Sequence, residues 1–165
     1  MIKNGIPKEN WHGRGPYIMG ELTKYLVKEH ILCNVEAADW REAIQKAAQP
    51  LVDAGKIGRT YVEHTIEKVE EMGPYFVITQ GVALAHTRPS DDVKEQCVSL
   101  MTLATPVKFG HKTNDPVEIV FMLAATTDNG HIDAVMHIAQ KLCEEGIREK
   151  IKSAQTAEEL YQLMM

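Results

Sequence analysis

The sequence predicts an α/β fold in which a mixed β-sheet has helices packed on both of its faces. Segments with a helical period alternate along the chain with short, densely apolar segments that are typical of buried strands. One of these, VEIVFMLAAT (117–126), is apolar almost throughout, as expected of a central strand covered on both faces. A chain of 165 residues can bury a core in two or three layers, so we expect a single domain over residues 1–165.

The N-terminal region is expected to form an irregular lead-in over residues 1–19. Its first 17 residues are polar and lack the apolar stretch of a signal peptide. From residue 20 to residue 33 the sequence begins with one helical turn and fades into a short apolar stretch. We therefore expect no signal peptide in this region.

Two amphipathic helices are predicted next, over residues 38–54 and 59–72. Asp39 is a plausible N-cap of the first helix, Pro50 is expected to kink it and Gly55 to close it. The second helix stops before Gly73 and exposes its EKVEE run to solvent. The residues expected to face inward are Trp40, Ala43, Ile44, Ala47, Ala48, Leu51 and Val52 in the first helix, and Val62, Ile66 and Val69 in the second.

Four buried strands follow from the apolar runs in the middle of the chain. Strands over 76–78 and 82–85 are joined at Thr79-Gln80-Gly81, and a third over 98–104 lies in CVSLMTLATPV, which Pro106 is expected to end. The fourth, over 117–125, is the expected centre of the sheet.

Two further helices are predicted after the fourth strand. TTDNGHIDAVMHIAQKLCEEG has a helical period, and Asp128 or Asn129 can cap its start. Thr156 and Glu159 form a capping box for a last helix at the C-terminus. The apolar stripe expected on the first of these helices consists of Ile132, Val135, Met136, Ala139, Leu142 and Cys143.

Composition and charge exclude several function classes. The formal net charge of −5 disfavours nucleic-acid binding, because the phosphate backbone requires a basic surface. No segment approaches the roughly 20 apolar residues that a membrane-spanning helix needs. The cysteines, Cys33, Cys97 and Cys143, are odd in number and lie in apolar segments, so we expect buried thiols in a reducing cytoplasm.

Two of the seven histidines stand out by position. His86 follows a predicted buried strand in GVALAHTRP (81–89), and His131 lies in the first turn of a predicted helix. In α/β proteins the sites lie where strands end and helices begin, and a helix N-terminus favours an anion. Because imidazole is mostly unprotonated at neutral pH, two histidines with an arginine would suit a phosphoryl group.

Structural roles explain the same residues at least as well. A histidine after a strand usually bonds a backbone carbonyl, and Asp128-Asn129-Gly130 is first of all a turn and a cap. His131 and His137 are six residues apart and do not share a helix face, so no zinc site is predicted from this pair. The histidines expected to face solvent are His12, His30, His64 and His111. Spacing alone leaves the function open.

Three long segments carry a family resemblance: residues 39–63, residues 73–93 (GPYFVITQGVALAHTRPSDDV) and residues 106–142. From about Gly20 to its end, the chain resembles the enzyme IIA domain of the bacterial phosphoenolpyruvate-dependent sugar phosphotransferase system, in the mannitol/fructose-type superfamily. The second segment resembles the phosphohistidine motif of that family, and the third its sheet strand with a second active-site histidine. The GPY and HxRP details are most similar to the ascorbate-type branch.

The resemblance implies a role for each candidate residue. His86 would accept a phosphoryl group from the phosphohistidine of HPr and pass it to a cysteine of the matching enzyme IIB, which works with a membrane permease, enzyme IIC. His131 would stabilise the phosphoryl group, without a cofactor. Gly81, Ala83 and Ala85 would keep the surface around His86 low enough for both partners to approach.

Two positions depart from the family pattern. The family commonly has a proline immediately before the phosphohistidine, where this chain has Ala85, so one fixed φ angle is lost. Many relatives carry an arginine on the preceding helix, where this chain reads EKVEEM, and Arg88 would serve as the phosphate-binding cation instead.

Three functions are compatible with these residues. The first is a phosphocarrier for ascorbate or a related sugar or polyol. The second is a regulatory phosphoprotein module of the same fold that acts through protein partners. The third is a non-transferring phosphate-binding or interaction domain, which the alanine at position 85 keeps open. The sequence names neither the sugar, which the permease recognises, nor the oligomeric state.

Overall fold

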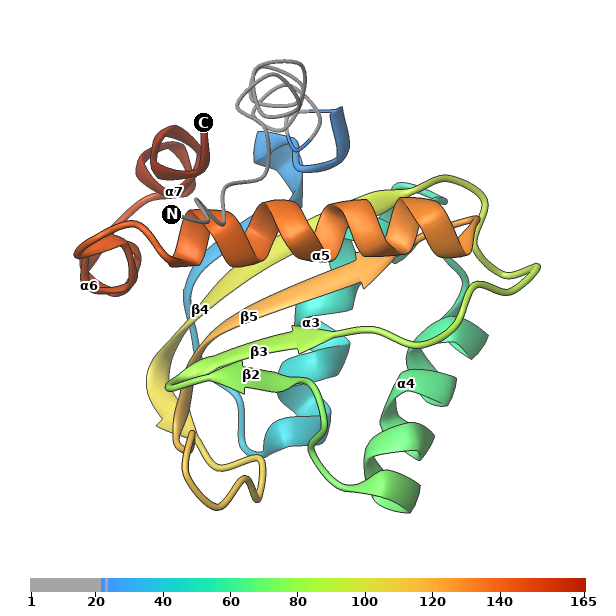
Figure 1. Cartoon of the computed structure of the whole chain (residues 1–165), viewed down its shortest axis with the longest axis horizontal. Coiled ribbons are helices and arrows are strands. Elements are labelled where there is room, and N and C mark those ends of the chain that lie inside the picture. Colours follow the sequence, from blue (N-terminus) through green and yellow to red (C-terminus); the bar gives the residue numbers. More distant parts are fainter. Residues whose placement is uncertain (1–21, 23) are drawn as a thin grey trace, which may run out of the picture.

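The computed structural model of the protein describes residue 22 and residues 24–165 (Figure 1). The expected lead-in over residues 1–19 lies outside these residues. Within the described part, no helix combines the length and the apolar composition needed to cross a membrane. The elements are the 3₁₀ helix η1 (Lys28–His30), β1 (Ile31–Val35), α3 (Trp40–Asp53), α4 (Arg59–Met72), β2 (Val77–Thr79), β3 (Val82–Ala85), β4 (Cys97–Val107), β5 (Val117–Ala124), α5 (Asp128–Leu142), α6 (Ile147–Ser153) and α7 (Ala157–Met164).

The strands form one mixed sheet of five in the order β1-β4-β5-β3-β2. β1 pairs with β4 and β3 with β5 in parallel, whereas β4–β5 and β2–β3 are antiparallel. β5 lies in the middle, and all of its residues except Glu118 are buried. The prediction that this apolar run forms a covered central strand is confirmed.

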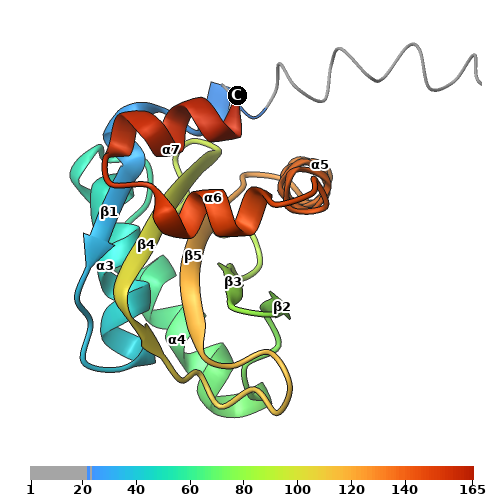
Figure 2. The ribbon, with the colours of Figure 1, turned by 90° about the vertical axis from the view of Figure 1, so that its left-hand side faces the viewer.

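Helices cover both faces of the sheet, as predicted. In Figure 1, α5 crosses in front of the sheet and α3 lies behind it, and Figure 2 shows α6 and α7 on the same face as α5. Alternate residues of β5 point to the two faces: Val120, Met122 and Ala124 join the core under α3 and α4, while Phe121 and Leu123 join the core under α5, α6 and α7. This two-sided burial explains why β5 lacks the polar alternation of a half-exposed strand.

Two predicted helix caps are confirmed, one at the start of α3 and one at the start of α7. Asp39 accepts a hydrogen bond from the Glu42 amide (2.9 Å) at the start of α3, and Thr156 accepts one from Glu159 (3.1 Å) at the start of α7. Pro50 is accommodated within α3, and Gly55, with φ of 71°, follows the helix end.

The predictions of strands and helices need four corrections. The apolar stretch before residue 36 is the edge strand β1, and α6 was not predicted at all. The short strand at residues 76–78 lies one residue later, as β2. Pro106 does not end β4, which continues to Val107, because the register shifts between Thr102 and Val107 and this irregular stretch tolerates a residue without an amide hydrogen.

The prediction for the inward face of α5 is right for Val135 and Leu142 but wrong for Ile132, Met136 and Cys143, and the predicted cap is wrong. The helix buries Ala134, His137, Ile138 and Leu142, whereas Ile132 and Met136 are 53% and 50% exposed. α5 carries two adjacent apolar stripes, and periodicity alone does not show which one faces the sheet. The cap is Thr127, whose hydroxyl accepts a hydrogen bond from the Gly130 amide (3.1 Å).

Several predictions of exposure and burial are also wrong. His30 is buried, because its Nδ1 forms a hydrogen bond with the Val98 carbonyl at 3.2 Å. Cys143 is exposed and Cys33 half-buried; only Cys97 is a fully buried thiol, and burial raises its pKa to about 12. His64 is exposed as predicted, His111 is half-buried, and His12 lies outside the described residues.

Candidate functional site

The two candidate histidines lie at the edge of the sheet where β3 and β5 both end. Because these strands are parallel neighbours, their carboxyl ends meet at this edge (Figure 1). His86 directly follows β3, and α5, which carries His131, follows β5 after a short connection. The ring centroids of the two histidines are 4.7 Å apart. The structure therefore brings together two residues that are 45 positions apart in the sequence.

Backbone geometry fixes which nitrogen of His86 is available for chemistry. Its Nδ1 lies 2.6 Å from the Leu84 carbonyl oxygen, which can only accept, so Nδ1 carries the hydrogen and donates it. Nε2 then holds a free lone pair. Burial, together with the neighbouring His131, lowers the pKa of His86 below its ordinary 6.5. His86 is thus a neutral imidazole at pH 7 with a nucleophilic Nε2.

His131 contributes a nitrogen that has nothing to bind. Its Nε2 is buried and has no hydrogen-bond partner among the described residues. Burial lowers the pKa of His131, and the nearby Asp128 only partly opposes this shift. A buried polar atom without a partner is uncommon and indicates a strained or functional position. Beside His86, this nitrogen is placed to meet a group bound there.

Two tyrosines hold the peptide group that follows His86. The hydroxyl of Tyr75, in the connection between α4 and β2, donates to the His86 carbonyl oxygen at 2.6 Å. The hydroxyl of Tyr61, on α4, accepts from the Thr87 amide at 3.2 Å and donates to the Leu123 carbonyl at 2.7 Å. Tyr61 is fully buried, whereas Tyr75 is 40% exposed.

A cavity of about 950 Å³ opens in front of the two histidines. Two cations line it, Arg88 and Lys68, and Asp128 is the carboxylate on its wall. Arg88 is exposed, as a flexible cation at the mouth of the cavity. The sequence analysis missed Lys68, because it lies in the EKVEE run that reads as a solvated helix face. Lys68 lies four residues before Met72, which also lines the cavity, so the two side chains share one face of α4. This helical spacing is the signal by which Lys68 could have been identified.

An apolar rim surrounds this cavity. Met72 and Ile132 are 65% and 53% exposed, and the ring of Tyr75 lies between α4 and β2 at the same opening. Met136, one turn further along α5, is 50% exposed. Such a group of large exposed apolar side chains beside a polar cavity is typical of a protein-binding surface.

The small residues of β3 have a different role from the predicted one. Gly81, Ala83 and Ala85 are all buried. Ala83 and Ala85 pack in the core under α3 and α4, and Ala85 pairs with Met122 of β5. The prediction that these residues lower the surface around His86 is wrong, because all three are buried. Ala83 and Ala85 instead let α3 and α4 pack closely on the sheet, whereas Gly81 lies just before β3. Sheet pairing, moreover, constrains the backbone at Ala85 without a proline.

The segment from His86 to β4 is anchored to both helices that flank the site. Asp92 accepts a hydrogen bond from the Tyr61 amide (2.8 Å) in the first turn of α4, where Gly58 offers no capping side chain. Gln96 donates to the Gly130 carbonyl (3.0 Å) in the first turn of α5. Each helix start is therefore positioned by the chain that carries His86.

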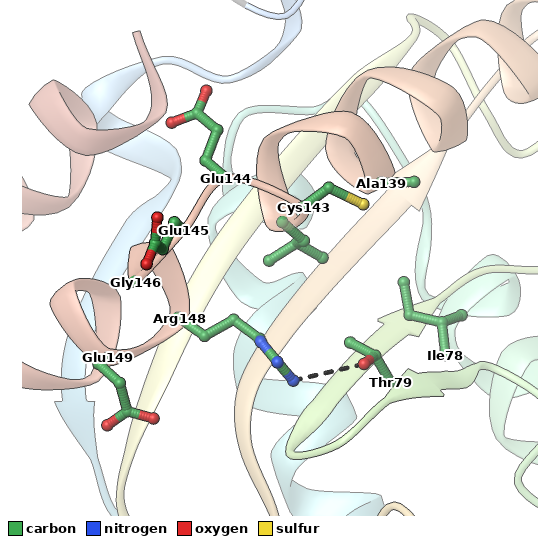
Figure 3. A pocket seen from close by; sticks show the side chains of 10 residues that line it. Ile78, Thr79, Ala139, Cys143, Glu144, Glu145, Gly146, Arg148 and Glu149 are labelled. Atoms are coloured by element: carbon green, nitrogen blue, oxygen red, sulfur yellow. Dashed lines mark hydrogen bonds between the residues drawn. The ribbon is translucent and has the colours of Figure 1, made fainter.

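A second cavity, of about 580 Å³, lies at the far end of α5 (Figure 3). Arg148 reaches across it to the Thr79 hydroxyl at 3.4 Å, with Ile78 on one wall and Cys143 on the other. None of the site residues predicted from the sequence lines it. The chemistry of paired histidines is confined to the first cavity.

Comparison with known proteins finds similar sequences over most of the chain. Residues 24–165 match the family described as "Phosphoenolpyruvate-dependent sugar phosphotransferase system, EIIA 2". The ascorbate-specific PTS system EIIA component of Salmonella typhimurium is 36% identical over 135 residues, which cover 81% of this chain and 88% of that protein.

Solved structures with the same fold include two phosphotransferase proteins of Escherichia coli. The mannitol-specific cryptic phosphotransferase enzyme IIA CmtB superposes with a TM-score of 0.79 at 29% identity, over 87% of this chain and 97% of that one. Enzyme IIA of the mannitol system, solved in complex with phosphorylated enzyme IIB, superposes with a TM-score of 0.73 at 23% identity, over 82% and 94% of the two chains.

Proposed function

Because the chain belongs to the EIIA 2 family of the phosphoenolpyruvate-dependent sugar phosphotransferase system, and is thus a phosphocarrier, we propose that it carries the phosphoryl group on Nε2 of His86. One observation carries this assignment. The hydrogen bond from Nδ1 to the Leu84 carbonyl leaves Nε2 as the unprotonated nitrogen, and the lowered pKa keeps it so at neutral pH. Phosphoryl transfer needs this form of imidazole as its nucleophile.

The loading step is an exchange of one P–N bond for another. The Nε2 lone pair of His86 attacks the phosphorus of a phosphohistidine on HPr, the bond to the donor ring breaks, and the donor nitrogen takes back the electron pair. Nδ1 of His86 keeps its proton throughout and donates it in the hydrogen bond to the Leu84 carbonyl oxygen. In the second step a cysteine thiolate of enzyme IIB attacks the same phosphorus, and His86 Nε2 leaves with the electron pair.

Charge around the phosphoryl group is neutralised by groups that already line the cavity. His131 can donate a hydrogen bond from its partnerless Nε2, and Lys68 and Arg88 supply positive charge. The first turn of α5 adds its free amide groups at the same opening. Catalysis then consists of positioning and charge neutralisation, which suffices for phosphoryl transfer.

The apolar rim formed by Met72, Tyr75, Ile132 and Met136 is the surface on which we place HPr and enzyme IIB in turn. A related enzyme IIA was solved in complex with phosphorylated enzyme IIB, which supports the second of these partners. Both partners must reach one nitrogen, so their footprints overlap on this rim. We place this exchange in the cytoplasm, with enzyme IIC as the membrane component that receives the sugar.

Ascorbate or a related compound is the proposed transported substrate. The support is the similarity to ascorbate-specific EIIA components, at 36% identity. A phosphocarrier does not touch the sugar, so the cognate permease decides this point. Transport and phosphorylation of radiolabelled ascorbate by a strain that carries the cognate IIB and IIC proteins would test it, with mannitol as the comparison sugar.

The phosphocarrier assignment is tested by incubation with phosphoenolpyruvate, enzyme I and HPr, followed by intact-mass measurement. We expect the mass of one phosphoryl group, labile in acid and stable in alkali, as a phosphoramidate is. His86→Ala is expected to abolish the mass shift while the circular dichroism spectrum stays native. An acid-stable label, or normal loading of His86→Ala, would place the phosphoryl group elsewhere.

A further inference from the structure

The peptide group between His86 and Thr87 is bound from both sides by tyrosine hydroxyls. Its oxygen accepts from Tyr75 at 2.6 Å and its amide donates to Tyr61 at 3.2 Å. These two hydrogen bonds engage both polar atoms of one peptide plane, so they fix the ψ angle of His86. The same Tyr61 hydroxyl is tied to the end of β5 through Leu123. Tyr61 therefore links this peptide to the end of β5, the strand that leads into α5.

Tyr75 also contacts the imidazole itself. Its ring packs edge-on against the His86 ring, with centroids 5.7 Å apart and an interplanar angle of 86°. Phe76 packs edge-on against Tyr75 in turn, with ring centroids 5.0 Å apart, which helps to hold the Tyr75 ring in place. One side chain thus constrains both the backbone and the ring of the same histidine.

This constraint acts on the hydrogen bond that selects the reactive nitrogen. The Nδ1 donor and the Leu84 carbonyl are separated by only two residues, so their 2.6 Å contact exists only for a narrow range of backbone angles at Ala85 and His86. The Tyr75 hydroxyl, bound to the His86 carbonyl, fixes the position of the Tyr75 ring, and this ring packs against the imidazole. If the Tyr75 ring shifts, the imidazole can rotate about its side-chain bonds and the contact of Nδ1 with the Leu84 carbonyl lengthens. Nδ1 and Nε2 then compete for the proton.

We propose that Tyr75 is a positioning residue for phosphoryl transfer, whose hydroxyl, bound to the His86 carbonyl, holds the Tyr75 ring against the imidazole so that Nδ1 stays on the Leu84 carbonyl and Nε2 stays unprotonated. The inference rests on the proposed function of His86. Tyr61 completes the arrangement but is fully buried, so its loss would also weaken the fold. Tyr75 is 40% exposed, and removal of its hydroxyl leaves both rings in contact.

The test compares Tyr75→Phe with Tyr161→Phe, a matched loss of a hydroxyl on α7, which packs on β1 and α6 away from this edge. Single-turnover loading from phosphorylated HPr is measured over a range of donor concentrations. We expect the maximal loading rate of Tyr75→Phe to fall about 3- to 10-fold, the effect of one neutral hydrogen bond, at an unchanged half-saturating concentration. Tyr161→Phe should load at the native rate.

A spectroscopic measurement separates positioning from partner binding. In ¹⁵N NMR spectra of the unphosphorylated protein at pH 8, native His86 should show a protonated Nδ1 and an unprotonated Nε2. In Tyr75→Phe both shifts should move toward the average of the two tautomers. Unchanged shifts and an unchanged maximal rate would overturn the inference. A higher half-saturating concentration alone would also overturn it, because it would show that the Tyr75 hydroxyl, like the ring on the apolar rim, serves only as a contact for HPr. If the native protein does not load at all, the phosphocarrier assignment fails first.

Discussion

Leucine at position 131 would show whether the partnerless nitrogen of His131 serves the phosphoryl group. In the folded protein this Nε2 makes no hydrogen bond with any described residue, so the substitution breaks no hydrogen bond at that atom, and leucine keeps an apolar contact with the His86 ring. We expect the free energy of unfolding of His131→Leu to stay within about 0.5 kcal/mol of native, or to rise. The melting temperature should then change by no more than about 2 °C.

The effect on transfer should be much larger. A hydrogen bond to a charged group contributes about 1.5–3 kcal/mol, and each 1.36 kcal/mol corresponds to a tenfold change. We therefore expect His131→Leu to slow transfer between about 10- and 150-fold. Both loading from HPr and onward transfer to the enzyme IIB cysteine should slow, because in each step an imidazole leaves a phosphoryl group whose charge His131 helps to neutralise.

The assay is rapid-quench measurement of both half-reactions, with thermal melts of the same preparations. His137→Leu is the matched control, since His137 also lies on α5 and has a buried Nδ1 without a partner in the described structure. It should melt like His131→Leu and transfer at the native rate. If His131→Leu transfers within twofold of native, the proposed role of His131 is refuted; a loss shared equally by both variants would indicate a helix defect.

Three further predictions follow from the site and its supports. Because burial lowers the pKa of His86, loading should stay constant as the pH falls from 8 to 6.5, and should decline only as the pH passes through that lowered pKa; a decline with a midpoint above 6.5 would contradict it. The free energy of unfolding should also decrease below about pH 6.5. There His86 binds a proton in the unfolded chain, but not in the folded protein, where its pKa is lowered. Gly58→Ala should lower the melting temperature by about 2–8 °C, because the added Cβ meets the Asp92 carboxylate that caps α4, and the effect should vanish in an Asp92→Ala background. Ile132→Asp should raise the half-saturating concentration of HPr at least tenfold without a change in melting temperature. Glu144→Asp, at the far end of α5, should leave that concentration unchanged. If both variants bind HPr equally well, α5 is not part of the docking surface.

The sequence predicted the features that depend on local chemistry. The continuous apolar run of β5, the Asp39 cap and the Thr156 cap each follow from a few adjacent residues, and all three are confirmed. His86 and His131 were singled out for their positions after a strand and at a helix start, and the parallel pairing of β3 with β5 then places those positions together.

The features that depend on tertiary packing could not be predicted. On α5 two apolar stripes compete for the sheet, and only the packing of α5 on β5 decides that Ala134 and Ile138 face inward while Ile132 faces out. Lys68 sits in an acidic run, and its approach to the cavity depends on how α4 lies on the sheet. The hydrogen bond from Tyr75 to His86 joins two loops whose distance no local pattern encodes.

The anchoring of the 87–96 segment bears on how this protein can diverge. Asp92 and Gln96 fasten it to the starts of α4 and α5, so the number of residues between His86 and each anchor is set by geometry. An insertion or deletion here would pull one helix start out of place, although the segment has no regular secondary structure. Adaptation to a new partner is therefore expected through substitutions on exposed positions such as Met72 and Ile132, at constant loop length.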